Sequence, residues 1–132
     1  MKIIRSLSVY TLAAMFAASV ALAANTPPAN TTSQFQGPKA NTGTATFFKE
    51  GGKNMLRVSA DFKVPDTPAP TWRVIDSRGN VYTLDAFKIK GGSGEKRQVV
   101  VPAYVQDIVT VQVYCAWAEV LLGEAKFASA VK

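Results

Sequence analysis

Short runs of alternating apolar and polar residues make up most of the chain after position 43. Alternation with a period of two is typical of β-strands that bury one face. Clusters of Gly, Pro, Asn and Asp separate the runs and indicate turns. We expect strands within residues 44–48, 55–62, 71–75, 81–84, 87–89, 97–101, 108–115 and 120–127. The pattern predicts an all-β protein, a single antiparallel β-sandwich of about seven or eight short strands.

The first 23 residues differ from this pattern, because they form one long apolar run with a basic start. Lys2 and Arg5 precede the apolar core, and Ala21-Leu22-Ala23 supplies the small residues of a cleavage site, so we interpret the segment as a secretory signal peptide. An uncleaved membrane anchor is the alternative. The expected organisation is a signal peptide at 1–23, a flexible lead-in rich in Pro, Thr, Asn and Gln at 24–41, and a β-sandwich domain at 42–132.

Export determines where the protein acts and which partners it can meet. We expect a periplasmic or secreted protein with no membrane span after signal cleavage. The formal charge of +6 falls to +4 without Lys2 and Arg5, and the remaining basic residues are scattered along the chain. Nucleic-acid binding is therefore not expected.

The chain contains no histidine. Histidine is the commonest general base and metal ligand in proteins, so its absence disfavours conventional catalytic triads and metal sites. We therefore expect that the protein is not an enzyme and that it has no metal site.

The only cysteine, Cys115, lies in the apolar run at 108–127. It shares strand parity with Val109, Val111 and Val113, so we expect its side chain on the core side of a sheet. A thiol in that position is either a structural packing residue or a reactive group. A reactive thiol would need a tertiary partner, for which Arg97 and Lys126 are the candidates. An unpaired cysteine in an oxidising compartment also leaves a disulfide-linked dimer open.

Several motifs of residues 42–127 resemble, in the same order, those of the DM13 domain family of extracytoplasmic β-rich modules. The matching segments are Gly43-Thr44-Ala45, Leu56 with Asp61-Phe62, Trp72-Arg73-Val74, Phe87-Lys88-Ile89-Lys90-Gly91, Val101-Pro102, and Val111-Gln112-Val113-Tyr114-Cys115 with Val120, Gly123 and Ala125. The last of these is the most specific, because it resembles the family's aromatic-cysteine signature.

The resemblance implies a DOMON-like β-sandwich that transfers electrons through Cys115. The cysteine would act as a bare thiol or hold a prosthetic group such as haem, and the identity of any cofactor stays unknown. Tyr114 stands where the family often has tryptophan. Ala118 and Leu122 stand where phenylalanine is expected, and Trp117 would supply that missing aromatic volume. Tyr114 and Trp117 are both expected to be neighbours of the thiol. The redox partner is not identified by the resemblance.

A non-redox module for ligand binding or protein interaction is the alternative function, with Cys115 as a structural residue. Trp72 and Tyr82 are candidates for stacking on a ligand, and Lys88 and Lys90 are candidates for contact with an anionic surface. The commoner roles of such residues are core packing for tryptophan and solubility for lysine beside a Gly-rich turn.

Overall fold

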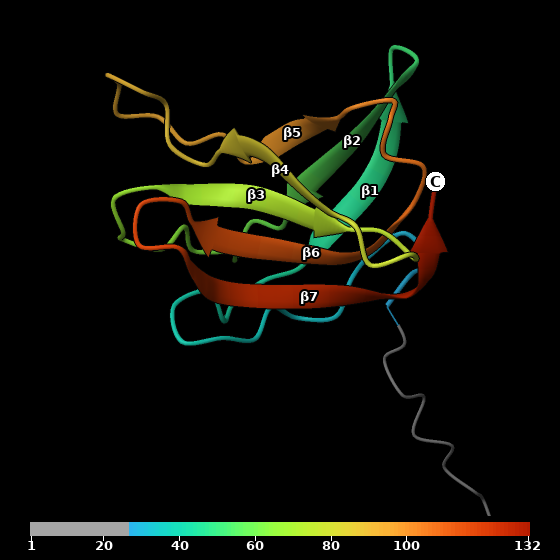
Figure 1. The fold of residues 1–132 in the computed structure, drawn as a ribbon, viewed down its shortest axis with the longest axis horizontal. Coiled ribbons are helices and arrows are strands. Elements are labelled where there is room, and N and C mark those ends of the chain that lie inside the picture. The colour runs from blue at the N-terminus through green and yellow to red at the C-terminus, as the bar shows by residue number, and fades with distance from the viewer. Residues whose placement is uncertain (1–26) are drawn as a thin grey trace, which may run out of the picture.

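The computed structural model describes residues 27–132 as an all-β domain, which confirms the predicted antiparallel β-sandwich (Figure 1). The predicted signal peptide at 1–23 lies outside the described residues. The seven strands are β1 (Ala45–Glu50), β2 (Lys53–Val58), β3 (Pro70–Ile75), β4 (Val81–Ala86), β5 (Gln98–Val101), β6 (Ile108–Cys115) and β7 (Val120–Val131). No helix within these residues is long and apolar enough to cross a membrane.

The strands form two antiparallel sheets that enclose one core. One sheet has the order β1-β2-β5 and the other the order β4-β3-β6-β7. The inward residues of both sheets pack together with apolar residues from the loops, and the largest fully buried side chains are Trp72, Phe35, Phe62, Phe87, Leu56 and Ile108. The alternation of apolar and polar residues in the sequence therefore predicted correctly which strand residues face the core.

Residues 30–40, which we call the strap, close one side of the sandwich. Thr32 N–H donates to Ala45 O of β1, and Ser33 N–H donates to Lys126 O of β7. Farther along, Gln36 and Glu124 exchange backbone hydrogen bonds. The strap thus provides hydrogen-bond partners for the edge of β1 and for the edge of β7, and it joins the two sheets.

The strap corrects the expectation of a flexible lead-in at 24–41. In the part of that range that the structure describes, Thr32, Phe35 and Ala40 are buried. The ordered domain therefore begins near residue 30 instead of 42. Burial of one aromatic ring and pairing to two strand edges overcome a local composition that has neither strand nor helix periodicity.

The opposite side of the sandwich, between the edges of β4 and β5, is open. Residues 87–97 connect these two strands, and Phe87 O accepts a hydrogen bond from Lys96 N–H where the connection begins. Beyond that point the two strands diverge (Figure 1). The predicted strand at 87–89 belongs to this connecting hairpin. We call the gap between β4 and β5 the open seam.

Candidate functional site

Cys115 is the last residue of β6, and its side chain faces the core as its strand parity predicts. Its register partners are Pro70 on β3 and Val120 on β7. The residue is only 2% exposed and its thiol is free. The sulfur therefore lies just beneath the turn that joins β6 to β7.

Neutral hydrogen-bond donors surround the sulfur. Ala118 N–H donates to Cys115 Sγ at 3.4 Å, and the N–H groups of Trp117 and Ala69 also point toward it. The Thr67 hydroxyl lies beside the sulfur and can donate to it. The Thr67 oxygen is buried and has no other hydrogen-bond partner. These donors, Ala118 first, favour the thiolate more than burial disfavours it, and together they lower the pKa of Cys115 below its usual 9.0.

The β6–β7 turn holds these donors in place through its own backbone. Glu119 N–H donates to Cys115 O at 2.8 Å, and Glu119 has a positive φ of 55°. Ala116 N–H donates to Ala69 O at 3.0 Å, which ties the turn to the segment before β3. The turn therefore aims successive N–H groups back at the sulfur, in the manner of backbone nests that hold anions.

The cationic partners expected from the sequence are absent from this arrangement. The Arg97 guanidinium donates to Ser59 O, Phe62 O and Glu95 instead. Lys126 is an exposed residue of β7. The actual donors could not be identified from the sequence, because three are main-chain groups and Thr67 comes from a proline-rich loop 48 positions from Cys115.

An exposed apolar surface covers the thiol. We call it the apolar turn, and it comprises Ala116, Trp117, Ala118, Val120 and Leu121. Trp117 is 76% exposed, the largest exposed fraction among the big hydrophobic residues of the described chain. Trp117 is therefore the apolar side chain beside the buried thiol that an approaching molecule would contact.

The other predicted neighbour of the thiol, Tyr114, points to the outer face of the sheet. The guanidinium carbon of Arg73 lies 3.9 Å from the centre of its ring, a cation–π contact. Tyr114 therefore does not share the core-facing environment of Cys115, although the two residues are adjacent in β6.

The structure does not bring the predicted binding residues together. Trp72 is fully buried and stacks on Phe87 with the ring centroids 4.4 Å apart, so the expectation that it stacks on a ligand is wrong. Tyr82 is half-buried and its hydroxyl donates to Asp76. Lys88 bonds Thr67 O at 3.0 Å and pairs with Asp66, while Lys90 is exposed on the 87–97 hairpin.

Haem does not fit at Cys115. An axial ligand needs an open cavity on one side of the sulfur, large enough for a flat macrocycle. Here the sulfur is 2% exposed and the backbone of the turn covers it at hydrogen-bonding distance. A cleft of about 580 Å³ lies in the open seam, and Cys115 does not line it.

Comparisons with protein families, with curated proteins and with solved structures found no match. The DM13 resemblance accordingly remains a prediction from the sequence motifs.

Proposed function

We propose that this protein is an exported redox module that transfers electrons through the bare thiol of Cys115. The observation that carries the proposal is the set of neutral donors around the sulfur, which lowers the thiol pKa without a nearby cation. A thiolate, and not a thiol, is the nucleophile in exchange with disulfides. A purely structural cysteine has no need of donors that favour its charged form.

The reaction is an exchange with a partner that carries a disulfide. Cys115 thiolate attacks one sulfur of that disulfide, a mixed disulfide forms, and the second sulfur leaves as a thiolate. A second thiol then attacks the mixed disulfide and releases Cys115 as thiolate again. The chain has one cysteine, so the resolving thiol must come from a second, reduced molecule. That molecule ends in a disulfide with the sulfur that Cys115 had attacked, and it is the electron donor to the sulfur that left as a thiolate.

Access to the sulfur requires the β6–β7 turn to move. The turn is held at its ends by the Glu119 and Ala116 hydrogen bonds, and its outer side chains contact solvent. A partner that binds Trp117 and the rest of the apolar turn would displace residues 116–119 from the sulfur, and the two donors outside the turn, Thr67 and Ala69, would still favour the thiolate. The apolar turn would thus combine recognition with exposure of the thiol.

The test is the rate at which native protein reacts with a small aromatic disulfide as a function of pH. The proposal predicts that the reaction rate rises with pH and reaches half of its maximum below pH 9.0. It also predicts that low concentrations of urea leave the rate unchanged. Thr67→Val should move the midpoint upward, and Cys115→Ser should abolish the reaction. If the rate instead rises with urea in parallel with global unfolding, the thiol is reached only in the unfolded protein and the redox proposal is wrong.

The alternative function is a non-redox interaction module in which Cys115 is structural. The observation that favours it is the low exposure of the sulfur, since free cysteine is commonly a buried packing residue. Under this alternative, Cys115→Ala would leave every binding property unchanged and would alter only stability.

A further inference from the structure

We propose that the open seam between β4 and β5 binds an extended peptide segment of another protein, apolar at alternate positions and acidic at its ends. This inference is independent of Cys115 and of the redox proposal. It rests on the hydrogen-bonding groups that the two strand edges leave free, on the cleft between them, and on the charge around it.

The edge of β5 has free backbone groups whose identity follows from the register. Val58 N–H donates to Arg97 O, and alternate residues along an antiparallel ladder exchange hydrogen bonds with the same partner strand. Val99 and Val101 therefore pair with β2. Gln98 and Val100 turn their N–H and C=O groups toward the seam.

The edge of β4 faces the seam in the same way. Asp76 N–H donates to Asn80 O, so Tyr82 pairs with β3 while Val81 and Thr83 direct their backbone groups outward. A strand lying in the seam has N–H and C=O groups on both sides and can pair with both edges. Peptides that add to exposed sheet edges gain affinity from such main-chain hydrogen bonds.

The molecule already contains this arrangement on its other side. The strap lies between β1 and β7 and hydrogen-bonds to both. A peptide between β5 and β4 would do the same at the open seam. The two sheets would then be joined along both sides, and the sandwich would close into a barrel with no free edge.

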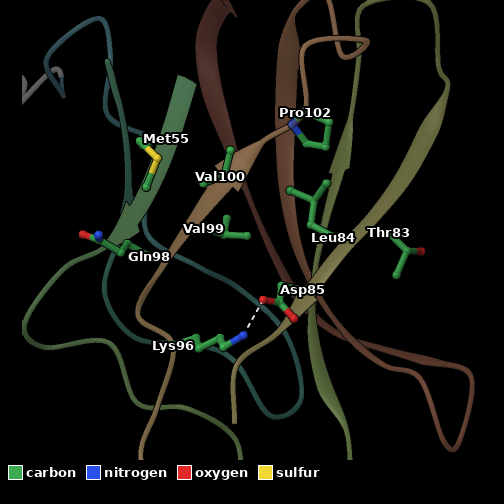
Figure 2. Close-up of a pocket in the computed structure, with 9 residues that line it drawn as sticks. All are labelled: Met55, Thr83, Leu84, Asp85, Lys96, Gln98, Val99, Val100 and Pro102. Atoms are coloured by element: carbon green, nitrogen blue, oxygen red, sulfur yellow. Dashed lines mark hydrogen bonds and ion pairs between the residues drawn. The ribbon is translucent and has the colours of Figure 1, made fainter. Parts of the chain in front are cut away.

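The floor of the seam determines which peptide it accepts. Figure 2 shows the cleft lined by Met55, Leu84, Val99, Val100 and Pro102, with the Asp85–Lys96 ion pair at one end. The Asp85 and Lys96 side chains already neutralise each other at 2.6 Å. Apolar side chains at every second peptide position would face this floor. The four residues of β5 match a paired segment roughly 13 Å long at about 3.3 Å per residue.

Charge favours a partner over a second copy of the chain. Residues 27–132 carry a formal charge of +4, since the chain's +6 includes Lys2 and Arg5. Arg57 lies on the outer face beside Gln98, with which it hydrogen-bonds, and Lys53 lines the hollow next to Val100 together with its register partner Glu50. Two copies joined through β5 would bring these cations together. Acidic residues at the ends of a peptide would be attracted to them.

The probe is the synthetic peptide acetyl-Asp-Val-Thr-Val-Thr-Val-Asp-amide, and the readout is amide hydrogen exchange by NMR on the mature protein. We expect the peptide to slow exchange at Gln98 and Val100 more than tenfold, with smaller protection at Val81 and Thr83. A peptide N-methylated at its valines and threonines cannot donate and should give no protection. Lysine in place of the two aspartates should weaken binding at least threefold at low salt.

Variants of the β5 edge provide a second readout. Val100→Pro removes an outward N–H and should abolish peptide binding, whereas Val100→Thr keeps that donor and should still bind, with affinity lowered only by the loss of one methyl group from the apolar floor. If Val100→Pro does not fold, the N-methylated peptide tests the complementary hydrogen bonds, from the peptide N–H groups to the outward carbonyls of Gln98 and Val100, without a variant.

Three results would overturn the inference. The first is no protection at millimolar peptide, and the second is protection confined to residues outside the two edges. The third is concentration-dependent protection of Gln98 and Val100 without peptide, together with a dimer in sedimentation. That result would assign the seam to a second copy of the chain.

Discussion

The ring of Phe35 packs against that of Phe62, with the ring centroids 5.0 Å apart and the planes inclined by 54°. Phe35 comes from the strap and Phe62 from the loop after β2, so this pair anchors the strap in the core. Both rings are buried, and Phe62 in turn stacks on Phe87 at 5.6 Å.

Phe35→Ala should therefore reduce the free energy of unfolding by about 3–5 kcal/mol, the usual cost of removing a buried phenylalanine. Urea denaturation with tryptophan fluorescence measures this. The control is Tyr104→Ala at an exposed loop position, which should cost about 1 kcal/mol or less. A loss for Phe35→Ala as small as that of the control would mean that the strap does not contribute to stability.

Gly123→Ala should loosen the strap at its other end. A Cβ on Gly123 would overlap Ala40 O and the Ala40 side chain, so the strap backbone would have to move away. We expect a loss of about 1–3 kcal/mol, typical of overpacking. Amide exchange at Lys39 and Ala40, which donate to Leu122 O, should accelerate. Gly92→Ala, where the added Cβ approaches only the Ile89 residue, should leave that exchange unchanged.

Acid should destabilise the protein through three aspartates. The Ser77 hydroxyl and N–H lower the pKa of Asp107, and the Lys96 hydrogen bond lowers that of Asp85. For Asp76, burial raises the pKa, but hydrogen bonds from Asn80, Tyr82 and Arg78 outweigh it and lower the pKa overall.

A lowered native pKa means that the unfolded state binds protons first as the pH falls. The stabilisation is complete above the usual value of 3.8 and is lost as the pH falls through the native pKa values. Thermal melts between pH 5 and about pH 2 should show this loss. Asp107→Asn should flatten the acid part of the profile, and Ser77→Ala should flatten it less, because the backbone N–H of residue 77 still donates to Asp107. An unchanged profile in both variants would contradict the assignment.

The thiol of Cys115 should make the stability of the protein depend on pH in the alkaline range. Donors led by Ala118 N–H lower the pKa of Cys115, so the native state releases its proton before the unfolded state does. The resulting stabilisation is complete above the usual 9.0 and is lost as the pH falls through the native value. Relative to Cys115→Ser, the unmodified protein should gain stability as the pH rises toward 9.0. A constant difference between the two across that range would show that the donors do not act on the sulfur.

The sequence predicted strands and core well because both depend on local alternation. Val111, Val113 and Cys115 are buried at one strand parity, and Trp72 is a core residue, which is the common role of a tryptophan beside valines. The outward-facing residues of β6 did not follow the predicted alternation of buried and exposed positions, since Thr110 and Gln112 are also buried. Neighbouring strands cover these positions, and a single strand's pattern does not contain that information.

The strap and the donors at the thiol could not be predicted for a related reason. Phe35 was the only strong apolar signal between residues 24 and 39 other than alanines and prolines. The strap is ordered by hydrogen bonds to β1 and β7, which are distant in sequence. Likewise, Thr67 and Ala69 reach Cys115 only because Pro70 of β3 pairs with Cys115 of β6.

The strap also constrains the order in which the chain can fold. Lys126 N–H donates to Ser33 Oγ across 93 positions of sequence, so the first ordered segment is completed by the last strand. Loop closure over such separations slows folding. Until β7 emerges, the strap has only one of its two partner edges. A chain that becomes available from its N-terminus would therefore stay incompletely folded until its last strand is complete.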